Sequence, residues 1–352
     1  MRVLFIGESW LGSCARSLKE ALGRRAEVEL DEVNEDAWFP RPRARLLRAL
    51  NRLTAPSYRR EFGAHVLDRV RRQQPDVVVV YKGFAVRPEL LAAIRDLGPV
   101  IVNVYPDFSP HAYGHAHRQA VGAYDIVIST KPFHPALWKQ TYGYDNRCVF
   151  VPQGYDPALH LASNPPSEFL FDLVLVATYR ATYGELMVEL AQRLGDRDLS
   201  VAVGGNGWGA IQDRLPRHWC FPGAVQGRGY VSLLRQGKIC IAPLTHERLI
   251  DGHRQPGDVD TTRTYELPAA HCFFIHQRTD YARGLYGEDE VPMYEGAAEL
   301  AAMVRHYLGH EDERVRMAAT AHRRAVPAYS LDQRASEIVH ILQRELAARG
   351  SH

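Results

Sequence analysis

The segment from Asp258 to Ile275 combines residues that can bind a ligand with an apolar run suited to a buried strand. Its sequence is DVDTTRTYELPAAHCFFI, in which Arg263 and Glu266 lie three residues apart, just before Leu267. Side chains three residues apart are neighbours on a helix surface, so a short helix here would present both charges on one face. Such a pair is either a solvated ion pair, which contributes little to stability, or part of a helix start that faces a ligand.

Two other cations of the second half could neutralise a diphosphate. Arginine offers a planar fork of hydrogen-bond donors to a phosphate group. Arg180 stands directly after an apolar run, where a ligand-binding group of an α/β protein is expected. Lys238 precedes its apolar run and is therefore the weaker candidate.

Two glycine-containing segments also follow apolar runs. In GESWLGS, Gly7 and Gly12 permit a tight turn and close approach of the backbone to a ligand at a helix N-terminus. The segment lacks the G-x-G-x-x-G pattern, which argues against a redox dinucleotide enzyme. GGNGW, at 204–208, is either a simple turn or a flexible wall of backbone beside a nucleotide or sugar.

The elements that must position these residues alternate along the chain. Continuous Val/Ile runs, such as 76–81, are typical of strands buried on both faces of a parallel sheet, and helical patterns separate them. A polar, proline-containing stretch at 161–167 indicates a linker, after which the alternation restarts. Strands are expected at 2–7, 28–33, 76–81, 99–105, 125–129 and 148–151, and then at 171–177, 199–204, 238–243, 272–276 and 291–294.

The sequence therefore predicts an α/β protein with two doubly wound parallel sheets. Ligands of such sheets bind outside the carboxyl ends of the strands. A cleft between the two halves would collect the polar residues that follow the strands. These are Gly7, Ser9, Gly12, Lys82, Asp107 and Gln153 in the first half, and Thr178, Tyr179, Arg180, Gly205, Asn206, Gly207 and Trp208 in the second.

The composition, 46% hydrophobic and 24% charged, is that of a soluble globular protein. No apolar run reaches the roughly 18 residues that cross a bilayer, and the N-terminus lacks a signal peptide, so we expect a cytoplasmic protein. Five scattered cysteines argue against disulfides or a zinc site. The histidine-containing segment 111–117 has only Asp107 as a nearby carboxylate, so no metal site is predicted there. Residues 349–352, RGSH, resemble a tag remnant.

The segment 41–72 contains ten arginines against Glu61 and Asp68, although the whole chain has a formal net charge of only +2. This segment is either a solvated basic helix or a surface for an anionic acceptor or anionic lipid. The second alternative allows peripheral contact with the inner face of the membrane. No nucleic-acid recognition motif accompanies the arginines, so nucleic acid is not an expected partner.

The ordered set of these segments resembles CgeB-like (spore-maturation-protein type) glycosyltransferases of the GT-B group. DTTRTYELPAAHCFFI is similar to the family's R-T-F-E-x-P-A-C-G-x-F block. Further similar blocks, in the same order, are RVLFIGESWLGS, VFVPQGYDPALH, FDLVLVATYR, VGGNGW and YVSLLRQGKICIAPL. The resemblance covers nearly the whole chain.

The resemblance implies the GT-B architecture, in which two Rossmann-like domains face each other across a cleft. The acceptor-side domain would span 1–160 and be completed by a C-terminal helix at 330–348. The donor domain would span 168–328 and bind a nucleotide-diphosphate-sugar. No cofactor is then required.

The resemblance implies that Glu266 binds the donor ribose. Asp258 takes the place of the first acid of the family's E-x7-E pattern, which contacts the sugar. Asp260 is the alternative residue for that role. Thr261, Thr262 and the first-turn amides would point at a phosphate. Arg263 would orient Glu266 or meet the diphosphate, and the first is preferred because Arg180 is free for the second.

The expected activity is hexosyl transfer (EC 2.4) without a metal, because the D-x-D spacing of Asp258 and Asp260 falls within the helix-start block. The resemblance favours retention of the anomeric configuration. An inverting enzyme would need a general base, for which Asp107 is the best-placed residue. The alternatives are a nucleotide-sugar-binding partner protein without transfer activity and a GT-B-type epimerase.

Overall fold

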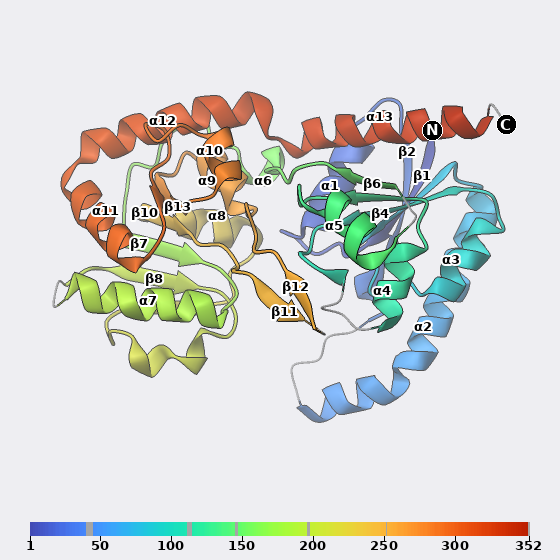
Figure 1. The fold of residues 1–352 in the computed structure, drawn as a ribbon, viewed down its shortest axis with the longest axis horizontal. Helices are drawn as coiled ribbons and strands as arrows, with labels where there is room; N and C mark the ends of the chain where they lie inside the picture. Colours follow the sequence, from blue (N-terminus) through green and yellow to red (C-terminus); the bar gives the residue numbers. More distant parts are fainter. Residues whose placement is uncertain (40–44, 111–114, 145–146, 196–197, 251, 351–352) are drawn as a thin grey trace. The chain divides into compact units, whose positions relative to one another are not determined.

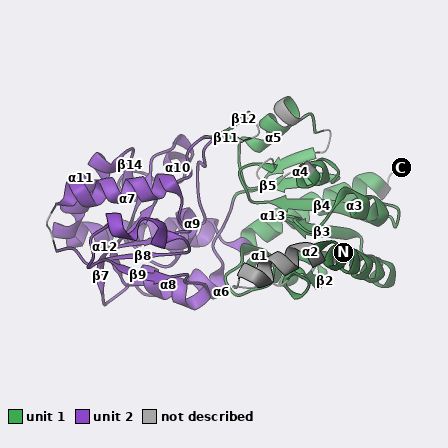
Figure 2. Ribbon diagram, turned by 90° about the horizontal axis from the view of Figure 1, so that it is seen from below, with its two compact units in different colours: residues 1–152, 249–255, 332–352 green, residues 153–248, 256–331 purple. Residues whose placement is uncertain are grey.

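The computed structural model describes residues 1–39, 45–110, 115–144, 147–195, 198–250 and 252–350, and it divides into two compact units (Figure 2). Unit 1 consists of Met1–Pro152, Leu249–Gln255 and Asp332–His352, and unit 2 of Gln153–Arg248 and Pro256–Leu331.

Unit 1 is built on a six-stranded parallel sheet in the order β2-β1-β3-β4-β5-β6. Every residue of the central strands β3 and β4 is buried, because helices cover both faces of the sheet. The strands are β1 (Arg2–Gly7), β2 (Glu29–Asn34), β3 (Val77–Tyr81), β4 (Val100–Tyr105), β5 (Ile126–Ser129) and β6 (Arg147–Phe150). The helices are α1 (Cys14–Gly23), α2 (Arg45–Gln73), α3 (Pro88–Arg95), α4 (His115–Gly122), α5 (His134–Leu137) and α13 (Leu331–Gly350).

The C-terminal helix α13 is tied to the elements of unit 1 by ion pairs. Asp332 accepts hydrogen bonds from Arg24, which follows α1. Near its other end, Arg349 pairs with Asp125 at 3.0 Å, just before β5. The chain thus returns to its first unit after completing the second.

The basic segment lies mainly on α2, and its first residues, 41–44, are outside the described part of the chain. In the second half of α2, Phe62, Val66 and Val70 are buried at four-residue spacing and pack into the core of unit 1. Arg69 pairs with Asp31 on β2. This half of the helix is therefore an ordinary amphipathic element with a charged outer face. In the described part of the chain, no helix combines the length and apolar character needed to span a membrane.

Unit 2 contains a second six-stranded parallel sheet, in the order β14-β13-β10-β7-β8-β9. Its strands are β7 (Phe171–Val176), β8 (Val201–Gly204), β9 (Cys220–Gly223), β10 (Gly237–Ala242), β13 (Phe274–Gln277) and β14 (Met293–Tyr294). Of these strands, Figure 1 labels β13, β10, β7 and β8. A separate two-stranded sheet, which apart from Arg248 belongs to unit 1, pairs β11 (Arg248–Ile250) with β12 (His253–Gln255). The helices are α6 (Pro157–His160), α7 (Ala181–Leu194), α8 (Gly227–Arg235), α9 (Arg263–Ala269), α10 (Asp280–Leu285), α11 (Ala297–Gly309) and α12 (Glu311–Ala328).

Alternate residues of β10 show why helices cover both faces of this sheet. Ile239 and Ile241 pack in a core cluster with residues of α7 and α11, whereas Cys240 and Ala242 pack in another with residues of α8 and α9. A strand buried on both faces has no polar alternation, which is the pattern that the sequence displays. The prediction of two doubly wound parallel sheets is confirmed.

Candidate functional site

The segment before β13 forms the short helix α9, as predicted, and a chain of hydrogen bonds fixes its start. Thr264 Oγ1 accepts from the Thr261 amide at 3.0 Å and contacts His276 Nε2 at 2.8 Å. His276 Nδ1 lies 2.6 Å from the Gln277 carbonyl, which only accepts, so Nδ1 carries the proton and Nε2 accepts from Thr264. Burial lowers the pKa of His276 to about 4, which agrees with a neutral ring.

Arg263 does not orient Glu266, and the preferred part of that prediction is wrong. The Arg263 side chain is buried and donates to the carbonyls of Val176 and Pro243, each at 3.1 Å. Val176 ends β7, and Pro243 directly follows β10. Arg263 thus joins α9 to the carboxyl ends of two adjacent strands, an interaction that spacing within the helix does not reveal.

Glu266 is also buried, and its partners come from other elements. Its Oε2 accepts from the Tyr230 hydroxyl of α8 at 2.6 Å, and its Oε1 lies 3.6 Å from His160 Nε2 of α6. His160 Nδ1 accepts the amide of Asp156, so the proton of the neutral ring is on Nε2, which faces the carboxylate. Burial raises the pKa of Tyr230 well above its ordinary value, and the charge of Glu266 adds to this effect. Sequence reasoning missed Tyr230 and His160.

The two aspartates before α9 occupy different environments. Asp260 is fully buried and accepts from the Tyr265 hydroxyl at 2.6 Å. Asp258 is partly buried, and its amide donates to the Thr245 carbonyl. Asp258 is therefore the more accessible of the two acids considered as sugar ligands.

The first turn of α9 uses several of its amides internally. Thr264 donates to the Thr261 carbonyl, and Tyr265 and Glu266 both donate to the Thr262 carbonyl. These three amides are therefore occupied. A contact of Thr261 or Thr262 with a phosphate remains a prediction.

At the end of β7, the chain passes through Thr178 and Tyr179 to Arg180, which precedes α7. Thr178 is exposed, and Tyr179 packs edge-on against Trp208 at 5.5 Å between ring centroids. Arg180 is the N-cap of α7 but makes no side-chain capping bond. Its partly exposed guanidinium has no hydrogen-bond or ion-pair partner among the described residues. Arg180 thus adds an uncommitted cation to a helix N-terminus.

The loop at 204–208 is held against the end of β7. The Tyr179 amide donates to the Asn206 carbonyl at 2.8 Å, and Trp208 Nε1 donates to the Ala177 carbonyl at 2.7 Å. Gly205 has φ of 129°, and a Cβ there would lie 1.9 Å from the Ala177 oxygen. Trp208 is buried in the core, so its side chain is structural. Gly207, with φ of 88°, and Asn206 remain exposed.

Lys238 lies away from the edge of the sheet at which the donor is expected. Lys238 is the second residue of β10 and pairs with Asp172, the second residue of β7, at 2.8 Å. Both lie at the amino ends of parallel strands, at the edge opposite to the one where ligands of such sheets bind.

A cavity of about 400 Å³ opens at the carboxyl edge of this sheet. Its walls include Thr182 and Tyr183 at the start of α7, Pro243 after β10, Gln277 of β13 and Tyr294 of β14. The hydroxyl oxygens of Thr182 and Tyr294 are buried and lack hydrogen-bond partners within the described ranges. The volume falls within the range of small-molecule pockets. Ala181, the residue after Arg180, is one of the residues that line the cavity.

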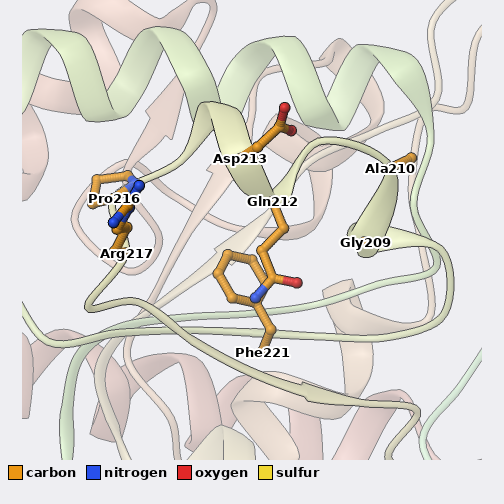
Figure 3. Close-up of a pocket in the computed structure, with 7 residues that line it drawn as sticks. All are labelled: Gly209, Ala210, Gln212, Asp213, Pro216, Arg217 and Phe221. Atoms are coloured by element: carbon orange, nitrogen blue, oxygen red, sulfur yellow. The ribbon is translucent and has the colours of Figure 1, made fainter.

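A second cavity, of about 540 Å³, lies beside the edge strand β9 (Figure 3). Its lining residues include Gln212, Pro216, Arg217 and Phe221. None of the residues predicted from the sequence lines this cavity, so it is not part of the candidate site.

In unit 1, the predicted glycines have mainly structural contacts. A Cβ on Gly7 would lie 3.0 Å from Phe5 and 3.2 Å from Tyr81, so the missing side chain allows β1 to pack closely on β3. Gly12 has φ of 94° and permits the turn before α1. Ser9 is held between the Asp36 carboxylate, which accepts its amide, and Lys19, which donates to its hydroxyl.

Two further predicted residues, Lys82 and Asp107, follow β3 and β4 of unit 1. Lys82 pairs with Glu8 at 3.7 Å. Asp107 has a buried Oδ2 without a hydrogen-bond partner in the described part of the chain. Burial lowers the pKa of His117, and the nearby Asp107 charge partly opposes this shift. Gln153, at the start of unit 2, is partly buried.

The second half of the chain is similar to a known protein family. Residues 180–340 match the family model described as Glycosyl transferase-like. The match begins at Arg180 and includes Tyr230 and Glu266. No curated protein matches the sequence significantly.

Three solved structures illustrate the similarity of fold. Sucrose-phosphate synthase from Thermosynechococcus elongatus has 13% sequence identity and a TM-score of 0.66, with 99% of this chain and 100% of that chain covered. HepE from Anabaena, in complex with UDP-glucose, has 12% identity and a TM-score of 0.66 over 98% and 100% of the two chains. AviGT4, involved in avilamycin A biosynthesis, has 15% identity and a TM-score of 0.62 over 99% and 98%.

The chain has the GT-B fold. The family match further identifies residues 180–340 as a glycosyltransferase domain, so the prediction of a glycosyltransferase is confirmed at this level.

Proposed function

We propose that this GT-B protein transfers a sugar from a nucleotide-diphosphate-sugar to an acceptor, with the donor bound at the carboxyl edge of the unit 2 sheet. The observation that carries this proposal is the position of Arg180. Its guanidinium has no partner in the described part of the chain, follows β7, and stands at the N-terminus of α7 beside a cavity of about 400 Å³. A helix N-terminus and an arginine guanidinium both favour the binding of a diphosphate.

In this proposal Arg180 stabilises the leaving group. Negative charge develops on the diphosphate as its bond to the anomeric carbon breaks, and a fixed cation stabilises that charge more in the transition state than in the ground state. Glu266 binds the ribose hydroxyls. Its partners Tyr230 and His160 hold the carboxylate in one orientation.

The proposed donor is a UDP-sugar, because the structurally similar HepE is described in complex with UDP-glucose. A thermal-shift comparison of UDP, GDP, dTDP and CMP tests the base, since a ligand that binds only the folded state raises Tm. Release of free UDP from UDP-sugars, with and without acceptors, tests transfer. Tight UDP-sugar binding without UDP release under any acceptor condition would instead indicate a binding protein.

We also propose that transfer needs no metal, because the cation of Arg180 takes the role of a metal at the diphosphate. Turnover is then unchanged by EDTA. Loss of turnover in EDTA and its recovery with magnesium or manganese would overturn this part of the proposal.

We propose that the chain is a CgeB-like enzyme. In line with this resemblance, the proposed reaction retains the anomeric configuration of the sugar. Asp107 in unit 1, with its buried and unbonded Oδ2, is the group to test as a base for inversion. Asp107→Asn should leave turnover near normal if no base is needed. A loss of several orders of magnitude would instead favour inversion.

Unit 1 is proposed to bind the acceptor, with Ser9, Lys82 and Asp107 at the carboxyl edge of its sheet. The arginines of α2 suit an anionic acceptor or an anionic lipid surface. Cosedimentation with vesicles containing anionic or only neutral lipids distinguishes these two alternatives.

A further inference from the structure

The turn between α11 and α12 in unit 2 brings two histidines and a glutamate together. His306 lies on α11, His310 is the residue between the two helices, and Glu313 lies in the first turn of α12. One ligand atom from each of the three side chains can be chosen so that all lie within 4.8 Å of one another. Both histidines are exposed, and Glu313 is partly buried, so an ion from solvent can reach the group.

The hydrogen bonds of this turn prepare His310 as a ligand. His310 Nδ1 lies 2.6 Å from the His306 carbonyl, which only accepts, so Nδ1 is protonated and Nε2 keeps its lone pair. A backbone carbonyl that holds the other ring nitrogen is a common arrangement behind metal-binding imidazoles. The two imidazole rings stack at 4.0 Å between centroids, with 17° between their planes.

The other two groups already have a spacing that suits a shared ion. His306 Nε2 lies 2.9 Å from Glu313 Oε2. Two ligand atoms with metal bonds of about 2.1 Å lie about 3.0 to 3.4 Å apart for angles between 90° and tetrahedral. An ion would displace the His306 Nε2 proton that now faces Glu313, and the stacked His310 ring would turn its Nε2 toward the same ion.

The turn that carries these residues is itself held in place. The buried Arg314 guanidinium donates to the carbonyls of Tyr307 and Leu308, near the end of α11. This contact gives the carbonyls at the end of the helix a side-chain donor. The ligand groups therefore stand on a supported junction between two helices.

We propose that His306, His310 and Glu313 form a Zn²⁺ site that links α11 to α12, separate from the donor site. Two imidazoles and one carboxylate are typical zinc ligands, and water would complete a four-coordinate site. Because the ion would join two helices, its role is to stabilise the folded state and not to take part in transfer.

The test is titration of the EDTA-treated, dialysed full-length protein with ZnCl₂, followed by calorimetry and thermal unfolding. We expect one Zn²⁺ per chain at this site and a higher Tm. His310→Ala and Glu313→Gln should each weaken zinc binding at least tenfold while leaving the metal-free Tm near that of the wild type. His340→Ala, which removes an exposed histidine of α13, is the matched control and should leave zinc affinity unchanged.

Crystals soaked in ZnCl₂ provide an independent measurement. Anomalous scattering at the zinc edge should give a peak beside His306, His310 and Glu313. Zinc affinity that is unchanged in His310→Ala and Glu313→Gln, or anomalous peaks only at other residues such as the C-terminal histidine, would overturn the proposal.

Discussion

Replacing Arg180 by methionine tests the proposed donor site, because the change removes the guanidinium and keeps an unbranched side chain. The guanidinium has no partner among the described residues, so the free energy of unfolding should change by no more than about 0.5 kcal/mol. A hydrogen bond to a charged group contributes about 1.5 to 3 kcal/mol. Loss of this interaction with the diphosphate should therefore weaken UDP binding roughly 10- to 150-fold.

Calorimetric titration with UDP, together with urea unfolding, measures both quantities. Lys238→Met is the matched control, since it removes a cation from the opposite edge of the same sheet. Breaking its pair with Asp172 should cost up to about 1 kcal/mol of stability and leave UDP affinity unchanged. The reasoning is refuted if Arg180→Met binds UDP as tightly as the wild type, or if Lys238→Met weakens binding equally.

Three further predictions concern stability, pH dependence and ribose recognition. Gly205→Ala should destabilise the protein by about 3 kcal/mol or more in urea unfolding, because its Cβ would meet the Ala177 carbonyl at 1.9 Å. In the control Gly209→Ala, the new Cβ has nothing within 4 Å, so the free energy of unfolding should change by no more than about 0.5 kcal/mol. Burial lowers the pKa of His276 from 6.5 to about 4, so the unfolded chain binds more protons between these values. The free energy of unfolding should therefore fall by up to about 3 kcal/mol as pH drops from 6.5 to 4. His276→Gln should remove this part of the pH dependence. Denaturant titrations in which the variant loses as much stability with falling pH as the wild type would contradict this prediction. Glu266→Gln should weaken UDP binding about tenfold but leave binding of 2′,3′-dideoxy-UDP unchanged, and an equal loss for both ligands would indicate a purely structural role.

Most strands of the two sheets could be predicted, because their residues are buried on both faces and form continuous apolar runs. The run at 76–81 became β3, and the run at 99–105 became β4. The strand β9 was missed because its sequence, CFPG, contains proline and glycine, which are tolerated at the edge of a sheet. The paired strands β11 and β12 were missed because each has only three residues.

The site was only partly predictable, because its decisive contacts join distant parts of the chain. The position of Arg180 follows from its place after an apolar run. The partner of Glu266 on α8, Tyr230, lies 36 residues away in the sequence, and no local spacing indicates it. Arg263 contacts the carbonyls of two other elements, although helical spacing suggested a pairing with Glu266.

The most direct test of the donor site is a crystal structure of the protein with UDP-glucose. We expect the diphosphate within hydrogen-bond distance of the Arg180 guanidinium and the ribose hydroxyls on the Glu266 carboxylate. A nucleotide bound elsewhere, with neither of these side chains in contact with it, would contradict the proposed function.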